Sequence, residues 1–149
     1  MKIMVLNGPN LNLLGIREPA IYGNRDYDAL TACIRQRASE LGVEVDIRQS
    51  NHEGVLVDWI QETLHGYDGI IINPAAYTHT SIAILDALKA VGLPAVEVHL
   101  SAIDKRDSFR HFSYAGMACA KTIIGRGFDG YLLALEYLVD TYSPSPKRD

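Results

Sequence analysis

The sequence has little of what marks a disulfide-rich or membrane-spanning protein. Its 149 residues include two cysteines, Cys33 and Cys119, which are far apart and belong to no Cys-x-x-Cys pair. Isolated thiols of this kind indicate reduced cysteines in the cytosol. No apolar run approaches the roughly 20 residues of a membrane span, and the first one meets Gly8-Pro9 too early for a signal-peptide core. We therefore expect a cytoplasmic protein with no membrane segment.

The sequence also lacks the signals of nucleic-acid, metal and common cofactor binding. Its formal net charge is −4 and its pI about 5.7, so no broad basic field exists to attract a phosphate backbone. The five histidines show no His-x-x-x-His or clustered Cys/His spacing, which argues against a metal site. The loop after the first apolar run carries no Gly-x-Gly-x-x-Gly, and no Walker-type Gly-Lys-Ser/Thr occurs. We expect no nucleic-acid partner, no metal and no cofactor.

The length and apolar content predict one domain with a single core. A chain of about 150 residues buries roughly two-thirds of its unfolded surface, but it is too short for a TIM barrel of about 250 residues. We expect residues 1–142 to form this domain and residues 143–149, rich in Ser, Pro and charge, to be a disordered tail. Short runs rich in Ile, Val and Leu predict strands buried on both faces of a parallel sheet. They lie at residues 2–7, 43–48, 69–73, 95–99 and 121–125.

Apolar residues recur at helical spacing between these runs, at 26–41, 52–64, 80–91 and 127–142. Strands that alternate with helices predict a doubly wound α/β fold, and five strands favour the flavodoxin-like order 2-1-3-4-5. Ser50 and Glu53 have the spacing of a capping box. Gly42, Gly66 and Gly92 each follow a helical stretch, as helix C-caps do.

Polar residues concentrate where the predicted strands end. In an open parallel sheet, ligands bind beyond the carboxyl ends of the strands. The loop of residues 7–24 is about three times the usual length of such a connection, as in binding loops and lids. His79 follows the third strand and His99 ends the fourth, with Arg106 and Arg110 beyond it. Together these loops supply the amides, imidazoles and guanidinium groups of a site for a small, oxygen-rich anion.

Some of these residues also have purely structural interpretations. Asn10 beside a proline is typical of a turn, and Arg17 taken alone is typical of a solvated charge. His52 and His65 fall at the two ends of a predicted helix, where they have structural roles. His79 and His99 differ, because both fall at strand ends on the expected ligand side.

Five blocks of the sequence resemble the type II 3-dehydroquinate dehydratases, over about residues 2–138. The blocks are Leu6-Asn7-Gly8-Pro9-Asn10-Leu11-Asn12-Leu13-Leu14-Gly15 with Arg17-Glu18-Pro19 and Tyr22-Gly23, Gln49-Ser50-Asn51-His52-Glu53-Gly54, Ile72-Asn73-Pro74-Ala75-Ala76-Tyr77-Thr78-His79-Thr80-Ser81, Glu97-Val98-His99-Leu100-Ser101, and Phe109-Arg110-His111. The resemblance implies dehydration of 3-dehydroquinate to 3-dehydroshikimate by trans elimination through an enolate. This is the third step of the shikimate pathway to chorismate and the aromatic amino acids.

The resemblance also implies roles for residues of these blocks. Tyr22 would be the general base, His99 the general acid and Arg17 the stabiliser of the transition state. Asn12 would help to hold the enolate oxygen, and Glu97 would orient His99. A guanidinium beside a phenol, whose pKa is ordinarily about 10, favours the phenolate that a base requires. Hydroxide is a poor leaving group, so the elimination needs an acid such as an imidazolium.

The remaining implied residues bind substrate: Asn73, His79, Asp86, Leu100, Ser101, Arg106 and Arg110. Asp86 follows His79 by seven residues, so the predicted helix would place both on one face. The family assembles trimers into dodecamers. The resemblance therefore implies a homododecamer in which Asp86 reaches a neighbouring subunit's site. One alternative from another class stays open at this point, a non-catalytic flavodoxin-like module that binds a small carboxylate as a sensor. The pairs Tyr22/Arg17 and Glu97/His99 favour the enzyme, since a binder needs neither a base nor an acid.

Overall fold

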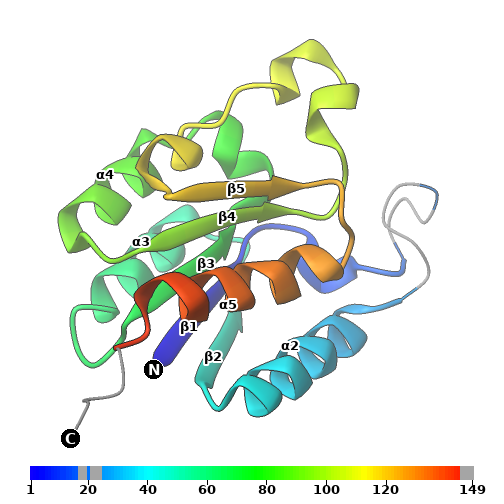
Figure 1. Cartoon of the computed structure of the whole chain (residues 1–149). Helices are drawn as coiled ribbons and strands as arrows, with labels where there is room; N and C mark the ends of the chain where they lie inside the picture. Colours follow the sequence, from blue (N-terminus) through cyan, green and yellow to red (C-terminus); the bar gives the residue numbers. More distant parts are fainter. Residues whose placement is uncertain (17–19, 21–24, 145–149) are drawn as a thin grey trace, which may run out of the picture.

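The computed structural model describes residues 1–16, 20 and 25–144, and it contains one parallel sheet of five strands (Figure 1). The strands are β1 (Lys2–Asn7), β2 (Glu44–Gln49), β3 (Gly69–Asn73), β4 (Ala95–His99) and β5 (Lys121–Ile124). Their order in the sheet is β2-β1-β3-β4-β5, and each neighbouring pair is parallel. The predicted flavodoxin-like fold and strand order are therefore confirmed.

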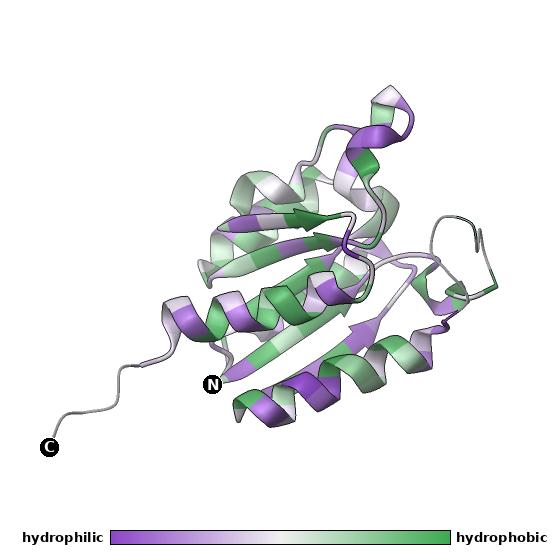
Figure 2. Ribbon diagram, turned by 45° about the vertical axis from the view of Figure 1, so that its right-hand side comes forward, coloured by the Kyte–Doolittle hydropathy of each residue, from purple (hydrophilic) through white to green (hydrophobic). Residues whose placement is uncertain are grey.

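Helices cover both faces of the sheet because its strands are apolar on both faces. Helices α2 (Tyr27–Leu41) and α5 (Asp129–Tyr142) lie on one face, and α3 (Glu53–Glu62) and α4 (Ile82–Val91) lie on the other. In β1, Ile3 and Val5 pack into the first layer while Met4 and Leu6 pack into the second. This alternation follows from the two-residue period of a strand. Figure 2 shows the apolar stretches along the central strands.

Helix caps explain where several elements begin and end. The Asp26 side chain accepts a hydrogen bond from Ala29 N at 2.8 Å and caps α2, and Ser81 caps α4 by accepting one from Ile84 N at 3.0 Å. Gly42 and Gly92 follow α2 and α4 with φ of 70° and 66°, the left-handed backbone that glycine adopts freely. These two predicted C-caps are confirmed.

Two predicted caps around α3 were wrong. Ser50 is not a capping residue of the helix, because its Oγ accepts from His52 N at 3.0 Å and His52 itself is the N-cap. Gly66 is not the C-cap, because α3 ends at Glu62 and the chain tightens into turns. The backbone nitrogens of residues 63, 64 and 65 bond three residues back instead of four. A side-chain hydrogen bond thus accounts for the first difference, and backbone bonds of three-residue spacing account for the second.

No helix was predicted in the loops at the carboxyl edge of the sheet, but several short 3-10 helices lie there. They are η1 (Leu11–Leu13), η2 (Ala75–His79), η3 (Ile103–Lys105), η4 (Ser108–Arg110) and η5 (Ala115–Ala118). The predicted tail begins where α5 ends at Tyr142, and residues 145–149 lie outside the described residues.

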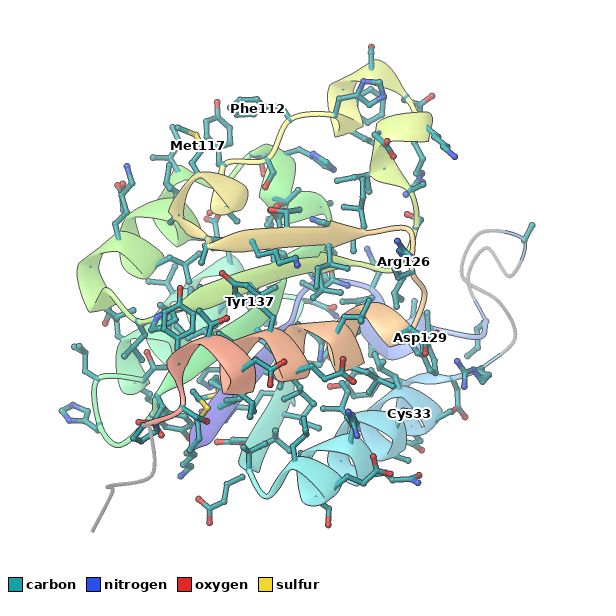
Figure 3. All side chains as sticks on the ribbon, in the orientation of Figure 1. Cys33, Phe112, Met117, Arg126, Asp129 and Tyr137 are labelled. Carbon is teal, nitrogen blue, oxygen red and sulfur yellow. The ribbon has the colours of Figure 1, made fainter. Side chains whose placement is uncertain are left out.

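Cys33 on α2, which is labelled in Figure 3, and Cys119 after η5 are both free thiols. Burial, and secondarily the charge of Glu97, raise the pKa of the Cys119 thiol to about 12. A thiol with this pKa is protonated at neutral pH and is a weak nucleophile. Within the described ranges, no helix is long and apolar enough to cross a lipid bilayer.

Candidate active site

A pocket opens at the carboxyl edge of the sheet, between the loops that follow β1, β3 and β4. Polar and positively charged side chains dominate one part of its wall, and apolar ones the other. The lining residues are Pro9, Asn10, Leu11, Leu14, Asn73, Ala75, Ala76, His79, His99, Leu100, Ser101, Ile103, Arg106 and Arg110. Ligands bind at this edge in doubly wound folds because the strand order reverses between β1 and β3.

Gly8 lets the loops after β1 and β3 come together at the pocket floor. Its backbone nitrogen donates to Asn73 O at 2.8 Å. A Cβ atom at this position would lie 2.4 Å from Pro74 O, closer than any side chain tolerates. The glycine is therefore required by the close approach of two backbones.

A buried tyrosine fixes the Asn73 amide at the end of β3. Asn73 Nδ2 donates to the Tyr131 hydroxyl at 2.9 Å, and that hydroxyl donates to Asn7 Oδ1 at 2.7 Å. Asn73 Oδ1 accepts from Ala75 N at 3.1 Å. Tyr131 is fully buried, and burial raises the pKa of its phenol, so it remains a neutral donor. Among the residues that the structure describes, no hydrogen bond uses the second N–H of Asn73 Nδ2, so it can bind a ligand in the pocket.

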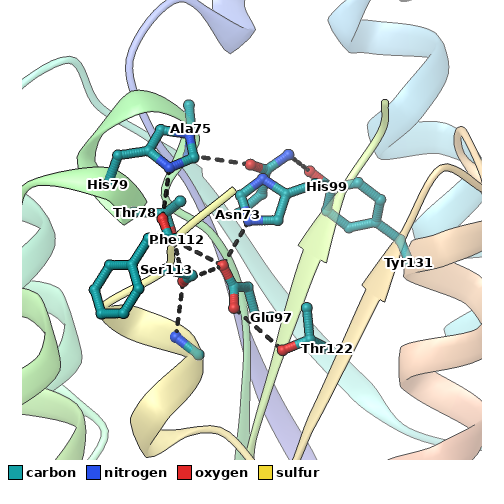
Figure 4. A network of polar contacts seen from close by, with 11 residues as sticks. Asn73, Ala75, Thr78, His79, Glu97, His99, Phe112, Ser113, Thr122 and Tyr131 are labelled. Carbon is teal, nitrogen blue, oxygen red and sulfur yellow. Dashed lines mark hydrogen bonds and ion pairs between the residues drawn. The ribbon is translucent and has the colours of Figure 1, made fainter. Parts of the chain in front are cut away.

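An imidazole and a carboxylate are paired at the end of β4. Glu97 and His99 are two residues apart on one strand, so both side chains point to the same face. His99 Nε2 and Glu97 Oε1 are 2.6 Å apart, and the two side chains are 5% and 0% exposed (Figure 4). Since Nε2 is engaged by the carboxylate, Nδ1 is the ring nitrogen that a ligand can use.

The carboxylate of Glu97 is held ionised although it is buried. Burial alone would raise its pKa, but a hydrogen bond and the charge of His99, and hydrogen bonds from Ser113 and Thr78, outweigh it. Together they lower the pKa of Glu97 to about 2. Because an ionised carboxylate only accepts, His99 Nε2 donates to Glu97, and this bond orients the imidazole.

The second imidazole and an arginine complete the polar wall. His79 Nδ1 lies 2.7 Å from Phe112 O, and because a carbonyl only accepts, Nδ1 carries the proton and Nε2 is left for a ligand. Arg110 Nε is buried and has no hydrogen-bond partner among the described residues. Among the described residues, the carboxylate oxygen Asp107 Oδ2 lies 3.9 Å from Arg110 Nε, beyond hydrogen-bond distance. A buried guanidinium N–H without a partner is ready to bind an anionic oxygen.

Comparison with known proteins places the chain in a family. The family model "Dehydroquinase class II" matches residues 1–139. A 3-dehydroquinate dehydratase of Lachnospira eligens is 50% identical over 142 residues, which is 94% of this chain and 97% of that protein. One from Clostridium perfringens is 55% identical over 139 residues, 93% of this chain and 96% of that protein. The chain belongs to the class II dehydroquinase family.

Solved structures agree with this assignment. The type II dehydroquinase from Butyrivibrio crossotus has a TM-score of 0.91 at 49% identity, and the match covers 93% of this chain and 97% of that one. The type II dehydroquinase from Propionibacterium acnes has a TM-score of 0.90 at 44% identity, with coverage of 93% and 96%. The family resemblance inferred from the sequence is confirmed.

The structure brings most of the predicted site residues of this dehydroquinase together. Glu97 lies directly behind His99, and seven predicted residues line the pocket. These are Asn73, His79, His99, Leu100, Ser101, Arg106 and Arg110. Tyr22 and Arg17, predicted as base and stabiliser, lie outside the described residues.

Two predicted residues lie away from the pocket within this single chain. Asn12 is exposed on η1, where its Oδ1 accepts from Gln49 Nε2 at 3.4 Å. Asp86 is exposed on α4. His79 ends η2 and α4 begins only at Ile82, so the expected helical face shared by His79 and Asp86 does not form.

Sequence reasoning missed the residues that hold the site from behind. Thr78, Ser113 and Thr122 contact Glu97, and nothing in their spacing signals it. Tyr131 did leave a signal, because it shares an apolar helical stripe with Leu135 and Leu138. A tyrosine in a core stripe needs a partner for its hydroxyl. Within residues 1–16, 20 and 25–144, no group of three or more metal-binding side chains gathers.

Proposed function

We propose that this dehydroquinase is a hydro-lyase that dehydrates 3-dehydroquinate to 3-dehydroshikimate, in the shikimate pathway to chorismate and aromatic amino acids. The observation that carries the proposal is the His99–Glu97 pair, 2.6 Å apart and buried, at the wall of a pocket with a second imidazole and Arg110. An acid held by a carboxylate beside an anion-binding group suits the removal of a hydroxyl from a hydroxylated carboxylate. Residues 1–142 would form the single catalytic domain.

The proposed reaction is a trans elimination in two steps. Tyr22, activated by Arg17, takes the proton from the carbon next to the ketone, and the electron pair moves to the ketone oxygen as an enolate. Donors around that oxygen, with Asn12 among them, stabilise its charge. The enolate then reforms the ketone as the carbon–oxygen bond of the leaving hydroxyl breaks, and His99 protonates the hydroxyl so that water departs.

The proposed substrate contacts use the polar and charged groups of the pocket wall. Arg110 and Arg106 provide positive charge for the substrate carboxylate, and the buried Nε–H of Arg110 supports this role. His79, Asn73 and the Leu100–Ser101 segment offer donors and acceptors to the ring hydroxyls. A pocket of local positive charge on a chain of net charge −4 explains how an acidic protein binds an anion.

We also propose that the protein assembles as a homododecamer of four trimers and acts in the cytosol. Met117 on η5 and Ile82 on the adjacent α4 are 61% and 53% exposed, and Phe112 is 54% exposed. Exposed apolar side chains of this size favour burial against another copy of the chain, and Figure 3 labels Phe112 and Met117 among them. The exposed Asp86 on α4 would then reach a neighbouring site. Elution of the pure protein at the monomer mass would contradict the assembly.

The test of the function is an ultraviolet assay. Purified protein is mixed with 3-dehydroquinate in the presence of a metal chelator, and the absorbance of the conjugated enone of the product is followed. We expect the absorbance to rise at a rate proportional to protein concentration and independent of the chelator. An absorbance that stays flat with a folded protein would refute the function.

A further inference from the structure

Three hydroxyl groups surround the carboxylate of Glu97 on the side away from the pocket (Figure 4). Thr78 Oγ1 and Ser113 Oγ each donate to Glu97 Oε1 at 2.6 Å. Thr122 Oγ1 donates to Oε2 at 3.2 Å. Thr122 pairs with Glu97 in the register of β4 and β5, which places the two side chains next to each other. Oε1, the oxygen that contacts His99 Nε2, is therefore also the oxygen with the two short hydroxyl contacts.

The backbone holds the two short donors in place. Tyr114 N donates to Thr78 O at 2.7 Å, so the segment that carries Ser113 is tied to η2. Gly116 N donates to Ser113 Oγ at 2.9 Å. Because this N–H occupies a lone pair of the serine oxygen, the serine proton remains available for Glu97. Thr78 is fully buried and its Oγ1 lies 2.7 Å from Ser113 Oγ, so water does not compete for the two hydroxyls, which form one hydrogen-bonded group with Glu97 Oε1.

Gly116 leaves the space that the carboxylate fills. A Cβ atom on this residue would lie 2.5 Å from Glu97 Oε2. It would also lie 3.3 Å from Ser113 Oγ and 3.4 Å from Thr122 Oγ1. The carboxylate is thus held by the hydroxyls of Thr78 and Ser113 and by Thr122 of the neighbouring strand. The missing side chain of Gly116 provides the space that it occupies.

These contacts affect the two protons of the His99 ring, the one on Nδ1 that it donates and the one on Nε2 that it keeps. When His99 acts as an acid through Nδ1, the neutral ring that results must retain the proton on Nε2 in order to be recharged at Nδ1. If Glu97 had no hydroxyl donors, its buried carboxylate would compete with the His99 ring for the Nε2 proton, and the carboxylate plane would be free to rotate. Two hydroxyl donors on Oε1 weaken that competition and fix the plane of the carboxylate.

We propose that Thr78 and Ser113 are positioning residues that act through Glu97 to hold His99 as the tautomer with a proton on Nε2 and with Nδ1 toward the pocket. The role in turnover rests on the proposed dehydratase function, whereas the tautomer exists without substrate. Neither hydroxyl touches the reacting atoms, so their effect falls on the rate of proton delivery and not on substrate binding.

The kinetic test compares Thr78→Val and Ser113→Ala with wild type in the enone assay. Hydrogen bonds to a charged group correspond to about 10- to 100-fold in rate. We expect each variant to lose kcat by about tenfold or more with KM changed less than about twofold, and Thr78→Ser to restore most of kcat. Thr63→Val is the matched control, since Thr63 is equally buried and its hydroxyl donates to Ile60 O at the end of α3. Its kcat should stay that of wild type.

The spectroscopic test needs no turnover. Solid-state ¹⁵N spectra of protein labelled at histidine report which ring nitrogen is protonated, and the His99 signals are assigned by their loss in His99→Asn. We expect a single Nε2-protonated form in the neutral ring of wild type and Thr63→Val, and a mixture of tautomers in Thr78→Val and Ser113→Ala. If wild type has no dehydratase activity, the proposed function fails while these spectra still decide the positioning role. His99 signals that are unchanged in folded Thr78→Val and Ser113→Ala would overturn the proposal. If Thr78→Val does not fold, the spectrum of Ser113→Ala alone decides whether the proposal stands.

Discussion

Removal of the Tyr131 hydroxyl tests how the pocket floor is held. In Tyr131→Phe, Asn7 Oδ1 loses the donor at 2.7 Å and Asn73 Nδ2 loses the acceptor at 2.9 Å. Asn7 is 0% exposed and Asn73 is 3% exposed, so water replaces these partners poorly. Phenylalanine fills the same space, so no new cavity contributes to the change beyond the missing oxygen.

The expected cost follows from the two orphaned groups. A buried polar group that loses its partner costs about 1–3 kcal/mol. Because Asn73 borders the pocket, its lost bond should cost about 1 kcal/mol, the lower end of this range. The fully buried Asn7 should cost about 2 kcal/mol, so the free energy of unfolding should fall by about 3 kcal/mol in total. With a urea m-value of about 2 kcal/mol/M, the unfolding midpoint falls by about 1.5 M.

The assay is urea unfolding at one fixed protein concentration, because subunit association also affects the midpoint. Tyr142→Phe is the control, since Tyr142 lies on the same helix and is 40% exposed. Its midpoint should shift by less than about 0.25 M, the equivalent of about 0.5 kcal/mol. A Tyr131→Phe midpoint equally close to wild type would refute the reasoning. In the enone assay, Tyr131→Phe should raise KM more than it lowers kcat, because Asn73 contacts substrate away from the reacting bonds.

Three further predictions concern charge and catalysis. The pKa of Glu97 is lowered from 4.5 to about 2, so its ionised carboxylate stabilises the fold above about pH 4.5, and this stabilisation is lost as the pH falls toward 2. Between pH 5 and pH 3, the Tm of Glu97→Gln should therefore fall less than the Tm of wild type. Arg110→Ala should raise KM at least tenfold with a smaller effect on kcat, measured from initial rates, and an unchanged KM would remove Arg110 from carboxylate binding. Tyr22→Phe should fold normally and lose most of kcat, and turnover at the wild-type rate would exclude Tyr22 as the base. Arg17→Ala should lower kcat far more than it raises KM.

The sequence predicted the fold well because periodicity and burial are local signals. Continuous apolar runs such as Ile70–Ile72 mark strands covered on both sides. The helical stripes between them predict a doubly wound sheet, in which five strands favour the order 2-1-3-4-5. Strand ends then identified the site, since the carboxyl ends of parallel strands meet at one edge. The pairing of Glu97 with His99 was implied by the family resemblance, and the two-residue period of β4 explains why the two side chains share a face.

What the sequence did not predict depends on contacts between distant segments. Ser113 reaches Glu97 from a loop 16 residues away, and Tyr131 reaches Asn7 across 124 residues, so neither spacing carries a signal. The helix predicted at 80–91 starts slightly earlier than α4, which begins at Ile82 after its N-cap Ser81 and is separated from η2, which ends at His79. That break is set by the Ser81 cap, a side-chain hydrogen bond that apolar periodicity does not contain.

The central claim is that His99, held by Glu97, protonates the leaving hydroxyl. The most direct measurement is kcat of His99→Ala beside wild type in the enone assay, with folding checked by thermal unfolding. General acid catalysis contributes about 10²–10⁴ in rate, so we expect kcat to fall by at least about 100-fold while 3-dehydroquinate still raises the Tm of the variant. A His99→Ala variant with the kcat of wild type would contradict the claim.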